Sequence, residues 1–321
     1  MSLVLNPESA RLAALLLALA IDLALGDPPN RCHPVAWIGR LLGAGQRRLC
    51  HGSPARLLVG GALVTIGVAG LTAVAAALVS RLAAGLGITG LVLEALALTC
   101  LLSLRDLIGA ARSVARDLDR GDLSAARRAV GYHLVSRPTS ELDESQVASA
   151  TIESVAENLT DSLVAPVCFF LAGGLVGAAV YRVINTADSM LGFRRGPLEY
   201  FGKIPARLDD LLNLIPARVA GLSLVAGAVL AGESGGVALA VLRRDRRRTQ
   251  SPNSGWPMAA MAGALGVALE KPGAHRLGAG AKPLGTDVER AIRVVAAASA
   301  VSVVLAVAVF VVGATVLGPA R

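Results

Sequence analysis

Three carboxylates at regular intervals give the first indication of chemistry in this sequence. Glu153, Glu157 and Asp161 are four residues apart, so in a helix they would line one face. Like charges at this spacing destabilise an isolated helix by about 0.2–0.5 kcal/mol per pair, and Mg²⁺ held with substrate phosphates would offset that repulsion. We therefore predict all three as metal ligands, with Glu157 also catalytic. An acidic face paired with nearby arginines is an equally supported interpretation.

A second polar segment, residues 185–195, directly follows an apolar run. It contains Asp188 and Arg194. Polar groups near membrane depth are costly unless they are satisfied or used. We predict Asp188 as a catalytic residue and Arg194 as a substrate-binding residue, with an ordinary membrane-interface loop as the alternative.

Three cations follow further along the chain. Lys203, Arg207 and Arg218 carry side chains that bind phosphates or carboxylates. We predict Lys203 as catalytic and the two arginines as substrate-binding. Contact with anionic lipid competes strongly with this interpretation.

Two further segments hold candidate substrate-binding residues. Ser251, Asn253 and Ser254 form a turn-forming cluster after the basic run 243–248, and such a turn could present backbone N–H groups to an anion. Spacing alone favours a plain loop there. His33 is the one histidine in a distinctive context, although a lone histidine is more often structural. The chain contains no P-loop, zinc-protease, nucleophile-elbow or Rossmann motif.

The composition indicates that these segments belong to an integral membrane protein. Of 321 residues, 54% are hydrophobic and 17% are charged, against about 25% charged in soluble domains. The net charge of +8 is better explained by membrane topology and anionic lipid than by nucleic acid, because the charges flank apolar runs.

Apolar runs of about 20 residues predict membrane spans. The qualifying runs are 10–25, 57–79, 86–104 and 291–317, and the marginal ones, both interrupted by glycines, are 163–183 and 219–242. The distribution of arginines places 27–56 and 105–161 in the cytoplasm. A spanning 163–183 would put the basic segment 185–218 outside, so re-entrant or buried hairpins are favoured for both marginal runs.

We therefore predict an all-α polytopic membrane protein with about 4–6 membrane-embedded helices, some re-entrant or broken. It would form one domain over 1–321 in the cell (cytoplasmic) membrane. Residues 105–161 would be a polar cytoplasmic insert of amphipathic helices. Leu107, Ala111, Val114 and Leu118 mark the first helix, Asp122 caps the second, and Ser140 caps a third over 141–163.

Several short segments occur in a specific order along the chain, namely Gly26-Asp27-Pro28, His33-Pro34-Val35, 152–159 with Ala165-Pro166, 185–190, 201–210, 213–218, 251–255 and 258–265. In this order they resemble the adenosylcobinamide-phosphate synthase (CobD/CbiB) family of cobalamin biosynthesis. The chain departs from the family's pattern at Pro138, Ser162, Ala187 and Leu277, and the missing acid at 138 removes one potential metal ligand.

The resemblance implies an amide ligase. Family members join an amino alcohol, usually as (R)-1-amino-2-propanol phosphate, to the propionate carboxyl of adenosylcobyric acid, giving adenosylcobinamide phosphate. ATP and Mg²⁺ are the implied co-reactants, and an acyl phosphate is the expected activated form of the carboxyl. The implied partners are the corrinoid, the amino alcohol phosphate, membrane lipid and soluble enzymes of the pathway, without nucleic acid. A non-enzymatic transporter, sensor or scaffold is the alternative.

Overall fold

The computed structural model describes residues 6–317, and its chain forms two compact units, each built from discontinuous segments. The first unit contains 6–103, Ala165–Leu212 and 306–317. The second contains Leu104–Val164 and Asn213–Leu305. The predicted single domain over 1–321 stays a prediction, and its ends at 1–5 and 318–321 lie outside the described residues.

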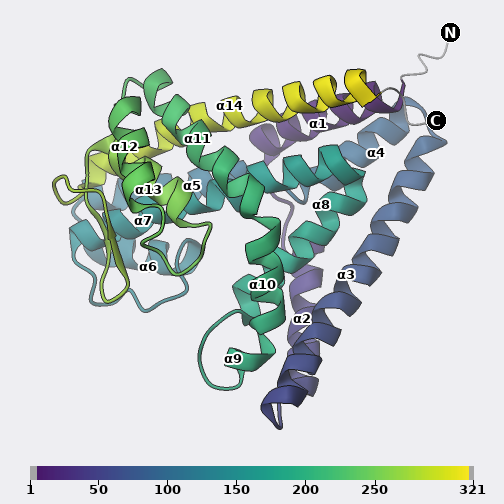
Figure 1. Ribbon diagram of the computed structural model, residues 1–321, viewed down its shortest axis with the longest axis horizontal. Coiled ribbons are helices and arrows are strands. Elements are labelled where there is room, and N and C mark those ends of the chain that lie inside the picture. Colours follow the sequence, from purple (N-terminus) through teal and green to yellow (C-terminus); the bar gives the residue numbers. More distant parts are fainter. Residues whose placement is uncertain (1–5, 318–321) are drawn as a thin grey trace. The chain divides into compact units, whose positions relative to one another are not determined.

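The helices of the first unit begin where the sequence provides caps. Each of the first three helices is preceded by a side chain that accepts a backbone N–H bond, from Asn6, His33 or Ser53. A proline occupies the first position of each helix, and this combination of cap and proline favours helix initiation. Figure 1 labels the elements of this unit, which are α1 (Pro7–Leu25), α2 (Pro34–Leu49), α3 (Pro54–Ala84), α4 (Ile88–Thr99), α8 (Ala165–Leu191), α9 (Leu198–Phe201) and α10 (Lys203–Leu212).

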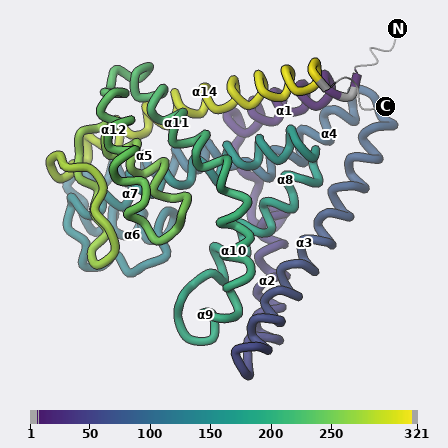
Figure 2. Tube along the Cα trace, in the orientation of Figure 1, coloured from purple at the N-terminus to yellow at the C-terminus, as the bar shows by residue number. Residues whose placement is uncertain are grey.

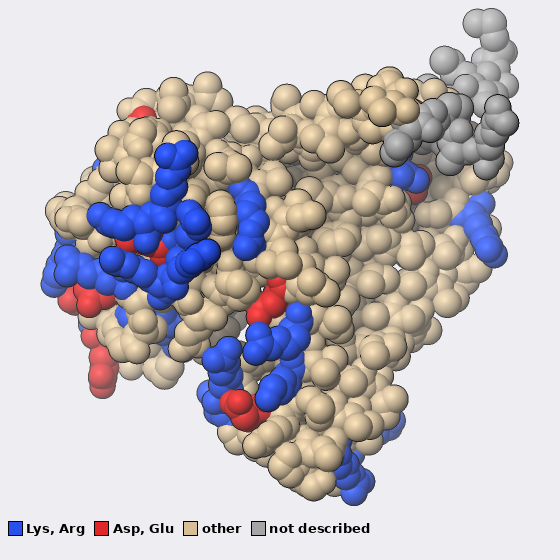
Figure 3. Space-filling model, viewed as in Figure 1, with Lys and Arg blue, Asp and Glu red and all other residues tan. Residues whose placement is uncertain are grey.

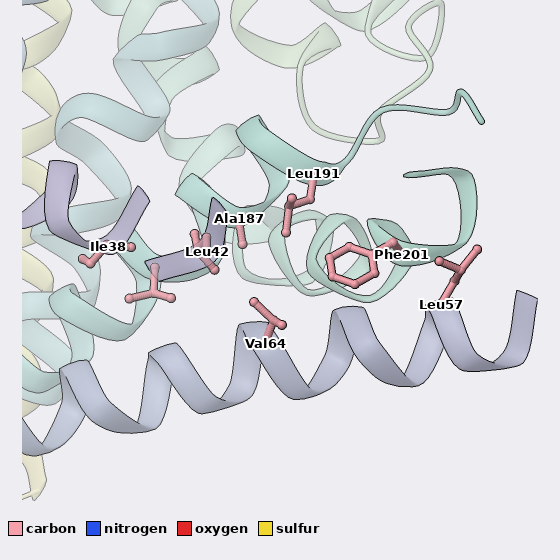
Figure 4. Close-up of a cluster of buried hydrophobic side chains, with 8 residues drawn as sticks. Ile38, Leu42, Leu57, Val64, Ala187, Leu191 and Phe201 are labelled. Carbon is pink, nitrogen blue, oxygen red and sulfur yellow. The ribbon is translucent and has the colours of Figure 1, made fainter. Parts of the chain in front are cut away.

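An apolar cluster joins α2, α3, α8 and α9. Phe201 is fully buried among aliphatic side chains, and Leu191, at the end of α8, lies in the same cluster (Figure 4). Its other buried members are Ile38, Leu42, Leu57, Val64, Val183 and Ala187. Burying such side chains stabilises the unit by roughly 1.5–3 kcal/mol for each large residue. The cluster therefore anchors the polar segment 192–200, which lies between Leu191 and Phe201.

Helix α8 reverses direction within the predicted run 163–183. Gly173 and Gly174 have non-helical dihedrals, and Gly174, at φ 62° and ψ −158°, has a conformation that essentially only glycine adopts. Phe169 stacks on Tyr181 with ring centroids 5.0 Å apart, although twelve residues of straight helix span about 18 Å. The chain therefore doubles back as a helical hairpin, as predicted for this run, and the reversal can be followed in Figure 2.

Three helical stretches are long and apolar enough to cross a membrane, namely Pro54–Ala84, Glu144–Leu191 and Gly285–Val316, and a fourth is added if Leu198–Leu230 counts as one broken span. The first contains the predicted run 57–79, and the third covers all but the last residue of the predicted run 291–317. The second contains the reversal at Gly173-Gly174, so its length does not describe a straight crossing.

Two predicted spans are not among these stretches. The run 86–104 forms only the 12-residue α4, about 18 Å long against a hydrocarbon core of about 30 Å. The run 10–25 forms α1, a 19-residue helix that carries Glu8, Arg11 and Asp22. These two helices pack against each other, and Thr99 donates a hydrogen bond to the carbonyl of Ala18. The overall prediction of an all-α membrane protein is nevertheless confirmed.

The second unit centres on α13, a largely buried helix that packs against α7, α11 and α12 (Figure 1). The predicted amphipathic helix is confirmed as α5, and Asp122 caps α6. The elements are α5 (Leu104–Asp119), α6 (Leu123–His133), α7 (Glu144–Leu159), the π-helix η1 (Thr160–Val164), α11 (Leu214–Leu230), α12 (Gly235–Asp245), α13 (Gly255–Leu265), β1 (Leu269–Lys271), β2 (His275–Leu277) and the first part of α14 (Gly285–Leu317).

One local prediction in this unit was wrong, and one small element was not predicted. The third helix begins at Glu144, not at Glu141, because Asp143 and Gln146 form a reciprocal capping box that outcompetes Ser140. An antiparallel pair of strands, β1 and β2, also follows α13 and packs on α7. Each strand has three residues, too few for an alternation pattern to reveal them.

Candidate functional site

The acidic face of α7 is only partly available for a ligand. Glu153 is 6% exposed, and its carboxylate accepts a bond from Ser149 Oγ at 2.9 Å and lies 3.1 Å from Nε2 of His275. Ser149 Oγ in turn accepts the N–H of Glu270 at 2.8 Å. Glu153 therefore fastens the β1–β2 hairpin to α7.

The other two acids of this face have different surroundings. Glu157 is exposed, and Asp161 and Lys271 are the charged groups that act on it most strongly. Asp161 lies in η1 and accepts a bond from Asn213 Nδ2 at 3.3 Å. The π-helix changes the helical spacing after Glu157, and such turns often occur at functional sites.

The predicted set of three carboxylate ligands is not assembled. Within residues 6–317, no three His, Cys, Asp or Glu side chains are grouped to hold a metal ion. Glu153 is engaged by His275 and Ser149, which leaves Glu157 and Asp161 as acids of this face. Mg²⁺ is commonly bound by one or two carboxylates together with substrate phosphates, so these two residues still suit Mg²⁺ brought in with a nucleotide.

In the first unit, a small hollow of about 200 Å³ lies between the end of α8 and α10. Arg194, Lys203 and Arg207 line it together with Glu199 and Asp210, and Figure 3 shows basic side chains gathered over the α9–α10 segment. One charge pair there, Arg207 with Asp210, is 3.9 Å apart, and the Arg207 side chain is exposed, so this pair is weak. Three cations and two acids line the hollow, so it carries a net positive charge that an anionic ligand could neutralise.

Asp188 lies at the edge of this hollow. Its carbonyl accepts the N–H of Gly192 at 2.7 Å, and Gly192 lines the hollow. One turn earlier on α8, Asn185 is buried and donates to Asp209 Oδ1 at 3.3 Å, which ties α8 to α10. The structure thus brings together four predicted residues of the first unit: Asp188, Arg194, Lys203 and Arg207.

His33 has a structural task. It is 6% exposed, its Nδ1 accepts the N–H of Val35 at 3.1 Å as the cap of α2, and its Nε2 lies 3.4 Å from Asp27 Oδ2. Since Nδ1 is the acceptor, Nε2 carries the proton and points to Asp27. Both ring nitrogens are engaged inside the fold, so the predicted role in substrate binding gains no support.

The remaining predicted residues meet in the second unit. Arg218 Nη1 donates to Asn253 Oδ1 at 2.8 Å, and Ser251 Oγ accepts the N–H of Asn253 at 3.2 Å. Ser254 precedes α13 and makes no side-chain capping bond to it. The guanidinium of Arg218 also lies over the ring of Trp256, at 4.9 Å from its centroid.

Sequence reasoning missed four residues of this unit. They are Lys271 and His275 on the β1–β2 hairpin, and Arg246 and Trp256 beside Arg218. Trp256 directly follows the turn-forming segment 251–255, and this adjacency was the one available signal. The other three depend on contacts between residues far apart in the chain.

Comparisons with known proteins agree with these motifs. The family model described as CobD/Cbib protein matches residues 15–311. A probable cobalamin biosynthesis protein CobD of Methanothermobacter thermautotrophicus is 41% identical over 269 residues, covering 84% of this chain and 87% of its own. The cobalamin biosynthesis protein CobD of Klebsiella pneumoniae is 42% identical over 265 residues, covering 81% and 82%. That of Rhodobacter capsulatus is 43% identical over 264 residues, covering 81% and 82%. No solved structure gives a significant match. The chain belongs to the CobD/CbiB family of cobalamin biosynthesis proteins.

Proposed function

We propose that this protein is an adenosylcobinamide-phosphate synthase. It would join the amine of 1-amino-2-propanol phosphate to the propionate carboxyl of adenosylcobyric acid. The observation that carries the proposal is that residues in or next to the family's motif segments form two polar clusters suited to anions. One is the hollow with Arg194, Lys203 and Arg207, and the other contains Arg218 and Asn253.

The reaction needs activation because a carboxylate is a poor electrophile. In the proposed first step a carboxylate oxygen of the corrinoid attacks the γ-phosphorus of ATP, which forms an acyl phosphate and releases ADP. In the second step the amine attacks the acyl carbon, inorganic phosphate leaves, and the amine loses a proton. Both steps bring several anionic oxygens together, so catalysis depends largely on positioning and on positive charge.

The residues of each unit have proposed tasks in this scheme. Lys203, with Arg194 and Arg207, would neutralise phosphate oxygens in the hollow, and Asp188 at its edge would orient the reacting groups. In the second unit, Glu157 and Asp161 would hold Mg²⁺, which neutralises charge on the nucleotide phosphates when bound.

We also propose that the protein lies in the cytoplasmic membrane with its site facing the cytoplasm, where soluble enzymes of the pathway could reach it. The basic segments 27–56, 105–161 and 185–218 support this placement under the positive-inside rule. The reversal of α8 at Gly173-Gly174 supports a hairpin whose ends return to one side. In a cysteine-free background, a Ser189→Cys variant should react with an impermeant maleimide added from the cytoplasmic side. Reaction from the periplasmic side alone would reverse the placement.

A direct assay tests the activity. Purified full-length protein in detergent would receive adenosylcobyric acid, 1-amino-2-propanol phosphate, ATP and Mg²⁺, and the corrinoid amide would be quantified by mass spectrometry alongside ADP. We expect equal amounts of amide and ADP. A folded protein that binds the corrinoid but forms no amide would refute the ligase proposal and favour the transporter or scaffold alternative.

A further inference from the structure

Two arginines of the second unit share a single indole ring. Arg218 of α11 lies 4.9 Å from the ring centroid of Trp256, and Arg246, at the end of α12, lies 5.0 Å from it. A guanidinium over an aromatic face is attracted by the ring quadrupole, and the ring holds its orientation. The arrangement therefore fixes two positive charges beside the first turn of α13.

Close backbone approaches build this arrangement. A Cβ on Gly255 would lie 2.2 Å from the carbonyl oxygen of Arg246, and a Cβ on Gly221 would lie 3.1 Å from the backbone carbonyl of Trp256. Only glycine allows the first of these contacts without movement of the backbone. The two glycines let α11, the end of α12 and the start of α13 converge, which brings the two arginines to the same ring.

No carboxylate neutralises the pair. Within the described part of the chain, neither Arg218 nor Arg246 forms an ion pair, and the charge of Arg246 acts repulsively on Arg218. The nearest acid in sequence, Asp245, is fully buried, forms ion pairs with Arg244 and Arg248, and accepts the N–H of Gly278. Two like charges held together without a counterion favour binding of an anion.

The chemistry of this site selects among the anions of the proposed reaction. Trp256 is occupied by two guanidiniums, so it offers little surface for stacking a nucleobase. Among the described residues, the acid nearest in sequence, Asp245, is already engaged, so it is not available to share a metal ion with a nucleotide. A small phosphate monoester needs neither of these, and it can accept bonds from two guanidiniums, which suit its oxygens. The partial positive charge at the start of α13, an 11-residue helix, adds to the attraction.

We propose that Arg218, Arg246 and Trp256 form the binding site for the phosphate of the amino alcohol phosphate, with Asn253 orienting Arg218. This inference rests on the proposed function for the identity of the ligand. It adds Arg246 and Trp256 to the substrate-binding residues and assigns the hollow of the first unit to the other phosphates of the reaction.

Trp256 itself provides the binding signal. The chain has two tryptophans, so a Trp37→Phe background leaves Trp256 as the single indole. This full-length protein in nanodiscs of zwitterionic lipid would be titrated with 1-amino-2-propanol phosphate, with the same amino alcohol lacking phosphate, and with ATP. We expect the phosphate ester alone to change the Trp256 fluorescence, with isothermal titration calorimetry as an independent measure of affinity.

Variants of single arginines test which side chains contribute to the affinity for the phosphate ester. Arg246→Gln and Arg218→Gln should each weaken binding of the ester roughly 10-fold or more, because each removes a charge-assisted bond. Arg247→Gln, a neighbouring exposed arginine that is not over Trp256, should leave the affinity unchanged. Equal affinity in the Arg246→Gln and Arg247→Gln variants would overturn the inference, as would a fluorescence response to ATP that matches the response to the ester.

Two further experiments are needed. The first distinguishes binding of the phosphate ester from binding of a lipid headgroup, and the second shows whether the proposed site or the proposed ligase activity is at fault. If nanodiscs of anionic lipid abolish the response, and the ester does not compete, the site binds a lipid headgroup and the inference fails. In the ligase assay, Arg246→Gln should raise KM for the amino alcohol phosphate with little change in kcat. Amide formation with unchanged KM would refute the site while sustaining the function, whereas ester binding without any amide would sustain the site and refute the function.

Discussion

Substitution of Glu153, which contacts His275, tests whether this acid of α7 holds the β1–β2 hairpin in place or binds a metal ion. Both side chains are 8% exposed, with 3.1 Å between Nε2 and Oε2. In Glu153→Ala, Nε2 of His275 loses its partner while buried, and Ser149 keeps its bond from the N–H of Glu270. One buried polar group left unsatisfied costs about 1–3 kcal/mol.

Glu153→Gln should behave differently. The amide oxygen can still accept from Ser149, and the amide nitrogen can donate to Nε2 of His275 if that ring carries its proton on Nδ1. We therefore expect a loss of less than about 1 kcal/mol. At about 2–4 °C per kcal/mol for a unit of this size, the loss of about 1–3 kcal/mol in Glu153→Ala should lower Tm by roughly 2–12 °C, and Glu153→Gln should lower it by a few degrees at most.

The assay combines stability, local opening and turnover. Thermal unfolding in detergent gives Tm, hydrogen exchange of the Glu270 and Lys271 amides reports opening of the hairpin, and the ligase assay at varied Mg²⁺ gives the metal dependence. If Glu153 only holds the hairpin on α7, Glu153→Gln keeps the Mg²⁺ dependence of the wild type, and Glu153→Ala accelerates hydrogen exchange of the hairpin amides. A large rise in the Mg²⁺ requirement of Glu153→Gln, with unchanged Tm and exchange, would refute this reasoning and restore Glu153 as a metal ligand.

Three other predictions follow from the site and the fold. Glu157→Gln and Asp188→Asn should each lower turnover at least about 100-fold with membrane insertion preserved, and near-normal rates in both would remove these residues from the catalytic proposal. The hydrogen bond from Arg244 holds the pKa of Asp245 below its usual value, so the stability from this acid is present above about pH 4 and is lost as the pH falls further. Asp245→Asn should flatten the decline of Tm below about pH 4, and an unchanged decline would contradict the assignment. Gly174→Ala should destabilise the α8 hairpin by roughly 1–3 kcal/mol, measured as a drop in Tm. Gly109→Ala, at an exposed glycine inside the regular helix α5, is the control and should not lower Tm.

Features set by neighbouring residues could be predicted from the sequence. The apolar spacing of α5, the cap at Asp122 and the glycine pair that reverses α8 depend on side chains close together in the chain. The prediction that residues 86–104 span the membrane was wrong because apolar composition does not indicate where a helix ends. Gly87 begins α4 and Cys100 ends it, which leaves a helix too short to cross.

The metal site illustrates where local reasoning stops. Spacing placed Glu153, Glu157 and Asp161 on one helix face, which holds only for an uninterrupted α-helix. The π-helix after Leu159 changes that register, and His275, 122 residues further along the chain, engages Glu153. Neither the π-helix nor the contact with His275 can be recognised from the spacing of the three acids. The hollow of the first unit was easier to anticipate, because Arg194, Lys203 and Arg207 lie within one short segment.

The same distinction explains why Arg246 was overlooked in the basic run 243–248. In the sequence its arginines look equivalent, and an anionic membrane surface accounts for all of them. In the folded unit the arginines have different partners. Asp245, which is buried, pairs with Arg244 and Arg248, whereas Arg246 stacks on Trp256. The position of one carboxylate within a basic run thus decides which cation remains available for a ligand, and that choice depends on the approach of α13 permitted by Gly255.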